Sequence, residues 1–413
     1  MRILYIDLTA GIGGSIVSLE QLLGVMDRRA FEPIVLLSSH NPAIARFRAM
    51  QVPVVTIPTV TADTARSSGV VSLVKGSQTG QRLRNGGLYS HLWDRARSVR
   101  NFLTRTLPLT WRLRRAIRAA QPALVHVNDA VFVSRPAIAA AWLAAKPSVC
   151  HVRSLGPLRF WDHLWARTVQ RFIFISRWVA DDQRRQGIPA AKGRLIYNGI
   201  DLTAYATPAD RRAARAALDL PLDRPIIAVV GRLVPWKGQA LFLEAMCLVV
   251  DAVPDALGLI VGEVESFSRE FGDELRALRD RLGLHDAVRF MGHSDDIPAV
   301  LAAVDVLAHT SVSPEPFGRV IVEAMAAGRP VITPAEGGGT EIVVDGVTGR
   351  WFQPRDAHAL AQAIIDLLTH PEAARAMGLA GRARAFQHFS SERLAAEVSA
   401  LYRDLGAERT GAI

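Results

Sequence analysis

The sequence predicts an α/β protein built from two doubly wound, Rossmann-like domains with parallel sheets. Its 413 residues are too many for one typical hydrophobic core, and 49% of them are hydrophobic, which is enough to fill two. Short runs of Val, Ile and Leu alternate with stretches of helical periodicity along nearly the whole chain. Continuous apolar strands joined by helical crossovers are typical of parallel sheets that are covered on both faces.

In the first half, apolar runs predict strands, and the segments between them repeat apolar residues at helical spacing. The predicted strands are 2–8, 34–38, 54–57, 124–127, 148–152 and 171–175. The predicted helices are 15–26, 42–50, 93–120 and 132–145. Pro108 falls inside the third helix and should break or kink it, because proline lacks the N–H that a helix interior requires.

The second half repeats the alternation. Its predicted strands are 226–231, 257–261, 288–291, 306–309 and 330–333, and its predicted helices are 239–250, 268–282, 297–302, 317–327, 357–368, 372–389 and 391–405. A polar, proline-bearing linker lies around 202–224, with room for a short helix at 210–218. We therefore expect one domain at 1–205, a second at 206–390, and a C-terminal helix at 391–413.

Cysteine content and hydropathy limit the cellular setting. The two cysteines, Cys150 and Cys247, lie in apolar surroundings and indicate buried thiols in a reducing compartment. The N-terminus runs directly into a strand without a cleavage pattern, so we expect no signal peptide. The longest apolar run, around 136–145, is too short to span a bilayer. We expect a cytoplasmic protein, soluble or peripheral.

Positive charge is concentrated in one segment. Residues 61–120 hold twelve Arg or Lys and two Asp, a net charge of +10 that equals the net charge of the whole chain. Within this segment, 91–120 interleaves arginines with Trp, Phe and Leu, a composition typical of helices at a membrane surface. An ordinary domain helix with a solvated basic face has the same pattern. Nucleic acid is the weakest alternative, because no recognition motif accompanies the charge.

Two glutamates eight residues apart, Glu315 and Glu323, are the most informative feature. The first lies in a Ser-Pro-Glu-Pro turn and the second in an apolar-periodic helix, about 12 Å further along the helix axis. Pro316 suits the first helical position, which leaves the N–H groups of Phe317 and Gly318 to bind a phosphate. In isolation, such a pair is more often ordinary helix surface.

Four further motifs accompany this pair in a fixed order. They are 11–14 (Gly-Ile-Gly-Gly) after the first strand, 196–201 (Ile-Tyr-Asn-Gly-Ile-Asp), 231–238 (Gly-Arg-Leu-Val-Pro-Trp-Lys-Gly), and 337–343 (Gly-Gly-Gly-Thr-Glu-Ile-Val) with 345–349. Together with the glutamate pair they resemble the retaining GT-B glycosyltransferases of family 4 (group 1). The resemblance implies two domains facing a central cleft, and a last helix that crosses back to the first domain.

A nucleotide-sugar donor needs fixed cations at its diphosphate, where charge develops as the sugar departs. Arg232 and Lys237, in the loop after a predicted strand, suit this role, and Gly238 lets the backbone approach. We expect no metal, because no Asp-x-Asp pair lies in a suitable loop. The pairs 181–182 and 295–296 are interpreted as carboxylates at helix starts.

The resemblance assigns further donor contacts. It implies that Glu323 binds the ribose hydroxyls and that Glu315 lies beside the donor sugar, near the reacting atoms but not as a covalent nucleophile. Phe317 and Gly318 would offer backbone contacts to the diphosphate or sugar. Glu341, after a flexible glycine turn, is either a donor ligand or a helix-start carboxylate, and Gly262 ends a strand near the donor.

The first domain should bind the acceptor. Gly13 and Gly14 form the turn after the first strand, near the donor phosphate, although any doubly wound fold has a glycine turn there. The strand-end residues are His126, Asn128, Asp129, His151 and Arg153. The family usually has a second histidine where this chain has Asn128, which can only form hydrogen bonds. The resemblance implies that His151 faces the donor sugar and that Arg153 holds a phosphate; otherwise both histidines are satisfied strand-end residues.

These residues indicate a retaining, metal-independent hexosyltransferase without a cofactor. The donor would be a UDP- or GDP-sugar, and the acceptor a polysaccharide, a glycolipid or a lipid-linked oligosaccharide. The resemblance implies that the leaving phosphate oxygen takes the acceptor proton. The alternatives are an epimerase of the UDP-sugar 2-epimerase type, which needs no acceptor, and an inactive module that binds a partner. The expected partners are the donor, the acceptor and an anionic membrane surface bound through 61–120.

Overall fold

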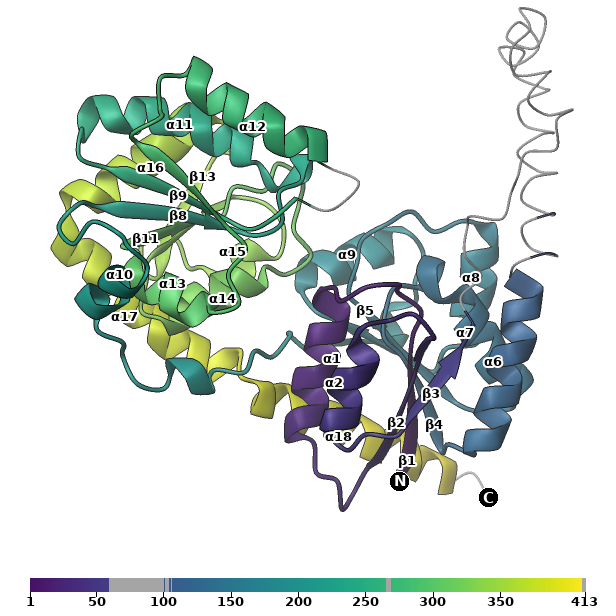
Figure 1. Cartoon of the computed structure of the whole chain (residues 1–413). Coiled ribbons are helices and arrows are strands. Elements are labelled where there is room, and N and C mark those ends of the chain that lie inside the picture. Colours follow the sequence, from purple (N-terminus) through teal and green to yellow (C-terminus); the bar gives the residue numbers. More distant parts are fainter. Residues whose placement is uncertain (59–99, 101–103, 105, 265–268, 411–413) are drawn as a thin grey trace, which may run out of the picture. The chain divides into compact units, whose positions relative to one another are not determined.

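The computed structural model describes residues 1–58, 100, 104, 106–264 and 269–410 (Figure 1). By their internal contacts these residues divide into two compact units. The first comprises 1–20, 27–173 and 184–194, and the second comprises 21–26, 174–183 and 195–413. The predicted boundary between 205 and 206, and the position of the last helix against the first domain, stay predictions.

A seven-stranded parallel sheet forms the centre of the first half, in the order β3-β2-β1-β4-β5-β6-β7. Its strands are β1 (Arg2–Asp7), β2 (Glu32–Ser38), β3 (Val54–Ile57), β4 (Leu124–Val127), β5 (Ser148–Val152), β6 (Arg171–Phe174) and β7 (Gly193–Leu195). Strands β4 and β5 are buried along their whole length because helices cover both faces of the sheet. The strand order reverses beside β1, so the carboxyl ends of β1 and β4 form the switch point where such sheets bind ligands.

The helices that connect these strands follow their sequence patterns. They are α1 (Gly14–Val25), α2 (Ala43–Ala49), α6 (Leu107–Ala120), α7 (Val131–Leu143), α8 (Phe160–Ala166) and α9 (Arg177–Arg185), with a 3-10 turn at η3 (Ala190–Lys192). Helix α6 buries Leu113 and Ile117, while its arginines lie on the remaining faces. Helices α6, α7 and α8 pack side by side along one flank of the sheet (Figure 1).

The second half contains a six-stranded parallel sheet in the order β10-β9-β8-β11-β12-β13. Its strands are β8 (Ile226–Val230), β9 (Leu257–Val261), β10 (Val288–Gly292), β11 (Val306–Ala308), β12 (Val331–Pro334) and β13 (Gly349–Phe352). Successive residues of β8 serve opposite cores: Ile227 and Val229 pack with α11 and α16, whereas Ile226 and Ala228 pack with α13. The order reverses between β8 and β11, which places the second switch point there.

The remaining elements complete the second unit. They are η4 (Thr203–Tyr205), α10 (Arg211–Ala217), η5 (Pro235–Lys237), α11 (Gln239–Ala252), α12 (Arg269–Arg281), α13 (Ile297–Ala303), α14 (Arg319–Ala326), α15 (Gly339–Ile342), α16 (Ala357–Thr369), α17 (Pro371–His388) and α18 (Ser391–Thr410). Aspartates begin three of these helices, because the side chains of Asp210, Asp296 and Asp356 accept hydrogen bonds from N–H groups of the first turn.

The segment that joins the halves is fixed by pairing with the chain's last helices. Ile200 and the backbone around Ser390 form a short parallel bridge, with Ile200 N–H donating to Phe389 O at 2.8 Å and Ser391 N–H donating to Ile200 O at 2.9 Å. A Cβ on Gly199 would lie 2.6 Å from Ser390 O. The glycine of the 196–201 motif is therefore required by this close approach within the second unit.

The eleven predicted strands are confirmed, but two helical predictions are wrong. Helix α14 begins at Arg319, because Gly318 ahead of it adopts φ 99°, so Pro316 is not the first helical residue. Helix α9 begins at Arg177, so Asp181 lies in its interior and does not start it. Pro108 lies in the first turn of α6, and because 101–103 and 105 lie outside the described residues, the expected break or kink stays a prediction. Of the remaining part of the predicted helix at 93–120, only 100, 104 and 106 are among the described residues.

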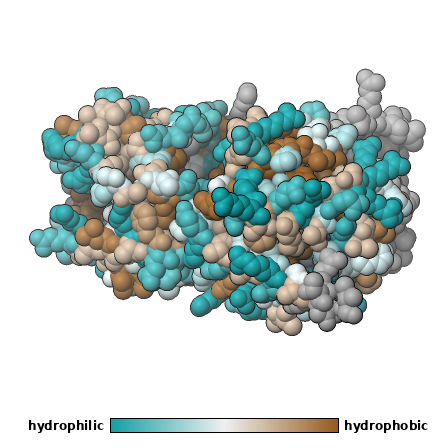
Figure 2. Space-filling model, turned by 90° about the horizontal axis from the view of Figure 1, so that it is seen from below, coloured by the Kyte–Doolittle hydropathy of each residue, from teal (hydrophilic) through white to brown (hydrophobic). Residues whose placement is uncertain are grey.

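Sequence patterns also missed short elements. Strands β7 and β13 have three and four residues, too few for a periodicity, and α8 and α9 were not anticipated as complete helices. Cys150 is buried as expected, whereas Cys247 is only partly buried. On the face shown in Figure 2, hydrophilic residues alternate with several hydrophobic areas. Among the described residues, no helix combines the length and apolarity needed to cross a bilayer.

Candidate active site

Three glycines mark the carboxyl ends of neighbouring strands in the second sheet. Gly231 (φ 151°), Gly262 (φ 140°) and Gly292 (φ 78°) follow or end β8, β9 and β10. A Cβ on Gly262 would lie 2.0 Å from Gly231 O, a separation that no side chain tolerates. Backbones therefore converge here, and Arg232 leaves the sheet at the switch point.

The turn that carries Lys237 is held against the end of β11. A Cβ on Gly238 would lie 1.9 Å from Thr310 O, and the Thr310 hydroxyl donates to Lys237 O at 2.9 Å. Gly238 has φ 71°, a conformation that favours glycine. The expected role of Gly238 in close backbone approach thus has a structural cause inside the protein.

Lys237 and Glu315 form an ion pair at the centre of this region. Lys237 Nζ lies 2.6 Å from Glu315 Oε2, and both side chains are mostly buried. The same carboxylate oxygen accepts from Ser311 Oγ at 3.3 Å and lies 3.5 Å from His309 Nε2. His309 Nδ1 lies 3.4 Å from the Thr333 hydroxyl. The structure therefore brings together a cation, a carboxylate and an imidazole at the carboxyl ends of β11 and β12.

This cluster holds Glu315 ionised. Burial alone would raise the pKa of the Glu315 carboxyl, but the Lys237 ammonium and the bond to His309 outweigh it and lower the pKa to about 2. Burial lowers the pKa of His309, although Glu315 opposes this, so the imidazole is neutral at pH 7. At neutral pH, Lys237 therefore faces a carboxylate that a bound diphosphate would have to share or displace.

The glycine-rich turn after β12 is packed, not flexible as its composition suggested. A Cβ on Gly337 would lie 2.8 Å from both Glu315 N and Glu315 O, and one on Gly338 would lie 2.5 Å from Pro316 O. Gly338 N–H donates to Glu315 O at 2.8 Å. The 337–339 glycines therefore position the backbone that carries Glu315.

Glu323 lies on α14 with Arg319 as its neighbouring charge. Arg319 Nη2 and Glu323 Oε1 are 3.5 Å apart. Burial raises the pKa of the Glu323 carboxyl, and Arg319 offsets only part of this effect. Phe317 is buried with its ring edge against Phe389, which leaves only its backbone for a ligand. A partly buried carboxylate with a raised pKa is a typical feature of a binding site.

Glu341 is engaged at a helix start. Its two carboxylate oxygens accept the N–H groups of Arg177 and Trp178 at 2.8 Å each, within the second unit. These are the first two residues of α9, so Glu341 caps that helix although it is itself part of α15. The Glu341 carboxylate is therefore satisfied by N–H groups of the protein itself and needs no contact with a nucleotide-sugar.

In the first unit, a hydrogen-bonded network occupies the switch point. Asn128 Nδ2 donates to Asp7 Oδ2 at 2.8 Å, and Arg153 Nε donates to Asn128 Oδ1 at 2.8 Å. Asp129 is buried beside them and accepts from the Ser154 hydroxyl at 2.7 Å. Burial raises the pKa of Asp129, and the hydrogen bonds that it accepts from the Ser154 hydroxyl and the Ala130 N–H oppose this only partly. Asn128, Asp129 and Arg153 are thus brought together, and Asp7 joins them.

The two histidines lie on adjacent strands of the same region. The rings of His126 and His151 meet edge to face with centroids 5.3 Å apart, and both side chains are fully buried. Burial lowers the pKa of His126 to about 3 and the pKa of His151 well below its ordinary value, and Arg153 adds to both effects. Both imidazoles are therefore neutral at physiological pH.

Arg153 also fixes the tautomer of His151. Its Nη2 lies 3.2 Å from His151 Nδ1, and because a guanidinium only donates, Nδ1 must accept and the proton resides on Nε2. His151 Nε2 is buried without a hydrogen-bond partner among the described residues. Such a donor is costly to leave unpaired, which is a reason to expect a ligand or water at this position.

Gly13 and Gly14 differ from the packed glycines. Helix α1 begins at Gly14, and Gly13 O accepts from Val17 N–H at 3.1 Å. A Cβ on Gly13 would meet no described atom within 4 Å. Packing therefore does not explain this glycine, whereas close approach by a ligand would.

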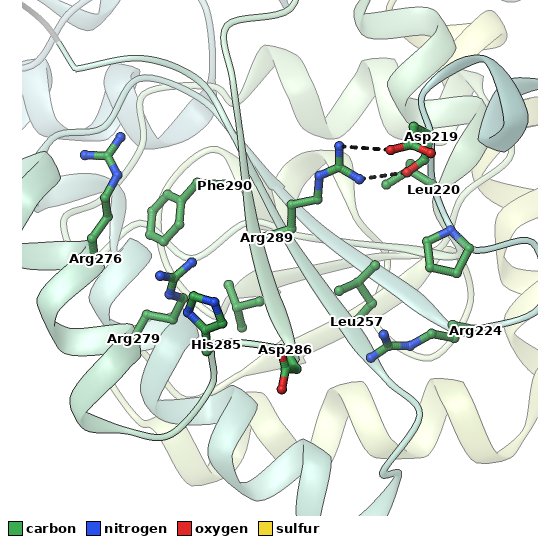
Figure 3. Close-up of a pocket in the computed structure, with 12 residues that line it drawn as sticks. Asp219, Leu220, Arg224, Leu257, Arg276, Arg279, His285, Asp286, Arg289 and Phe290 are labelled. Carbon is green, nitrogen blue, oxygen red and sulfur yellow. Dashed lines mark hydrogen bonds and ion pairs between the residues drawn. The ribbon is translucent and has the colours of Figure 1, made fainter.

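A cavity of about 760 Å³ lies elsewhere, at the amino ends of β9 and β10 (Figure 3). Two of its arginines form hydrogen bonds to backbone carbonyl groups: Arg224 donates to Asp255 O and Ala256 O, and Arg289 donates to Asp219 O. In Figure 3, Arg276 and Arg279 lie beside the ring of Phe290. This cavity lies at the amino ends of the strands, whereas ligands of such sheets bind at the carboxyl ends. We therefore do not assign it to the active site.

Two family models match the chain, one for each half. The model described as "Glycosyltransferase Family 4" matches residues 12–204, and the model described as "Glycosyl transferases group 1" matches residues 210–384. The chain belongs to glycosyltransferase family 4. The second match contains the Lys237–Glu315 pair, and the first contains the Asp7-linked residues Asn128 and Arg153.

Similar proteins agree with this family and with the GT-B fold. D-inositol 3-phosphate glycosyltransferase of Mycolicibacterium paratuberculosis is 35% identical over 243 residues, or 56% of this chain and 54% of that protein. The chain thus matches about half the length of this relative. Anabaena Alr3699/HepE, solved in complex with UDP, has a TM-score of 0.79 at 25% identity over 98% of this chain and 100% of its own. Sucrose-phosphate synthase from Thermosynechococcus elongatus, at 24% identity and a TM-score of 0.71 (98% and 99% covered), shares the fold.

Several residues of the Lys237–Glu315 cluster and of the Asn128–Arg153 network were not predicted from the sequence. Asp7, the last residue of β1, could have been found from its position at a strand end beside the switch point. His309, Ser311 and Thr333 follow or belong to apolar strands and carry no motif of their own. Their participation depends on which strands are neighbours.

Proposed function

We propose that this protein is a retaining, metal-independent glycosyltransferase that uses a nucleoside diphosphate sugar. The observation that carries the proposal is the mostly buried Lys237–Glu315 pair, which lies at the switch point of a sheet whose residues match the group 1 glycosyl transferases. Since HepE, a structural neighbour at 25% identity, was solved with UDP, a UDP-sugar is favoured over a GDP-sugar as donor.

The proposed donor chemistry needs positive charge at the diphosphate and hydrogen bonds to the ribose. Lys237 and Arg232 would stabilise the leaving diphosphate, which replaces the charge that a metal would otherwise supply. Glu323 would accept hydrogen bonds from the ribose hydroxyls, and Glu315 would contact the sugar while it holds Lys237 in place. The Glu315 carboxylate is ionised at pH 7, so it can also stabilise positive charge that develops on the sugar.

The first unit would bind the acceptor. Arg153, oriented by Asn128, and the Nε2–H of His151 are donors suited to hydroxyl or phosphate oxygens. In the proposed reaction, the bond from the anomeric carbon to the diphosphate breaks and a bond to the acceptor oxygen forms on the same face. The acceptor proton passes to the departing phosphate oxygen, so no protein base is required.

The acceptor is proposed by class: a polysaccharide, glycolipid or lipid-linked oligosaccharide at the inner face of the cytoplasmic membrane. The relatives' printed acceptor, inositol 3-phosphate, is not transferred to this chain, because the match covers about half of those proteins. The predicted membrane contact through 61–120 involves a segment of which the structure describes only 100, 104 and 106–120.

A thermal-shift screen of UDP, GDP and ADP with EDTA present tests the donor site. A ligand that binds only the folded state raises the melting temperature by mass action, so UDP should stabilise the wild type in EDTA. Lys237→Met should remove most of this shift. A shift that appears only with added Mg²⁺ or Mn²⁺ would contradict metal independence. Conversion of the donor sugar without any acceptor, followed by NMR, would instead indicate an epimerase.

A further inference from the structure

Exposed aromatic side chains gather on one flank of the first unit. Among the described residues, six Trp and Phe side chains are exposed, and four of them lie on α6, α7 and α8: Trp111 (47%), Trp142 (56%), Phe160 (77%) and Trp161 (52%). Leu164 on α8 is exposed as well. Because these three helices pack side by side, the exposure belongs to one surface and not to scattered positions.

Rings on this surface contact one another both between and within helices. Trp142 on α7 meets Trp165 on α8 edge to face, with centroids 6.2 Å apart. Phe160 and Trp161 meet in the same way at 5.5 Å, and the Arg114 guanidinium lies 4.8 Å from the Trp111 ring. An aromatic cluster of this size has a substantial free-energy cost in water, so we expect another phase or molecule to cover it.

The charge around the aromatic cluster has one sign. Helix α6 carries Arg112, Arg114, Arg115 and Arg118 without an acidic residue, and α7 carries only Arg135. The one acidic residue of the three helices, Asp162, is buried and bound by Arg135. Exposed Arg159 and Arg167 flank α8. The surface is therefore complementary to negative charge.

We propose that this α6–α8 surface docks on an anionic lipid bilayer. Trp and Phe side chains favour the boundary between headgroups and acyl chains, and the arginines would bind the lipid phosphates. The proposal deepens the proposed function, since a lipid-linked acceptor would be presented at such a surface. A second copy of the chain is a weaker occupant, because two like-charged arginine faces would repel one another.

Vesicle co-sedimentation of the full chain, without substrates, tests the proposal. We expect binding to vesicles of phosphatidylcholine with phosphatidylglycerol, and weaker binding to phosphatidylcholine alone. The triple variant Trp142→Ser, Phe160→Ser and Trp161→Ser should bind the anionic vesicles about tenfold or more weakly. The matched control, Val347→Ser with Leu379→Ser, removes two similarly exposed apolar side chains from the second unit and should bind like the wild type.

Other outcomes overturn the proposal. Equal binding by the triple variant and the wild type would show that the surface does not contact lipid. A wild-type dimer that the triple variant converts to a monomer would assign the surface to a second copy of the chain. UDP stabilisation of the same proteins reports folding and donor binding separately from vesicle binding. A wild-type protein that UDP stabilises but that does not bind anionic vesicles would therefore refute this inference and leave the proposed function intact.

Discussion

Removal of the Glu315 charge is the most direct test of the donor cluster. Glu315 is mostly buried, and Lys237 is the cation bound to it at 2.6 Å. A pKa that falls from its ordinary value of 4.5 to about 2 corresponds to about 3 kcal/mol of stabilisation at neutral pH. Glu315→Gln should therefore reduce the free energy of unfolding by about 3 kcal/mol, because it leaves Lys237 buried without its carboxylate.

The double variant separates pairing from simple side-chain loss. Lys237→Met should also cost about 3 kcal/mol, since it leaves Glu315 without its cation. Lys237→Met with Glu315→Gln should cost much less than the two together, by a coupling energy of about 3 kcal/mol in urea unfolding at pH 7. A coupling energy below about 1 kcal/mol would refute the assignment of Lys237 as the cause of the lowered pKa.

The pH dependence has a fixed direction. Because the pKa of Glu315 is lower in the folded state, its contribution is complete above about pH 4.5 and is lost as the pH falls toward 2. The difference between wild type and Glu315→Gln should narrow by about 1 kcal/mol between pH 6 and pH 3.5. A difference that stays constant over this range would contradict the depressed pKa.

Four further substitutions test other residues. Glu323→Ala should weaken UDP binding at least tenfold, by about 1.4 kcal/mol or more, with little effect on acceptor binding. Because burial raises the pKa of Glu323, wild-type UDP affinity should fall with decreasing pH sooner than for an exposed glutamate, and calorimetry from pH 7.5 to 5 checks this. Gly262→Ala should destabilise the protein by about 2 kcal/mol or more, because its Cβ would overlap Gly231 O; Gly13→Ala should leave the melting temperature unchanged and weaken only donor binding. Arg153→Met should reduce kcat/KM about 100-fold while UDP still stabilises the protein, and equal loss of UDP stabilisation would move Arg153 to the donor site.

Local sequence patterns determined the architecture of this protein. Apolar runs separated by helical periodicity located eleven strands, because burial of a parallel strand on both faces leaves a continuous signal in the chain. The five ordered motifs indicated the family that the two family models then showed. Around Pro316 and Gly318 the local signal was ambiguous, and the predicted start of α14 was two residues too early. The neighbouring residues do not reveal that Gly318 adopts a left-handed φ, which delays the helix to Arg319.

The tertiary structure alone decided which side chains meet. Lys237 and Glu315 are 78 residues apart, and their pairing depends on the packing of one loop against the end of β11, which brings the two loops together. Asp7 and Asn128 meet across 121 residues for the same reason, because β1 and β4 are neighbours in the sheet. Motifs identify the chemistry that individual residues can perform, whereas partners, burial and pKa arise from strand order and packing, which no short segment specifies.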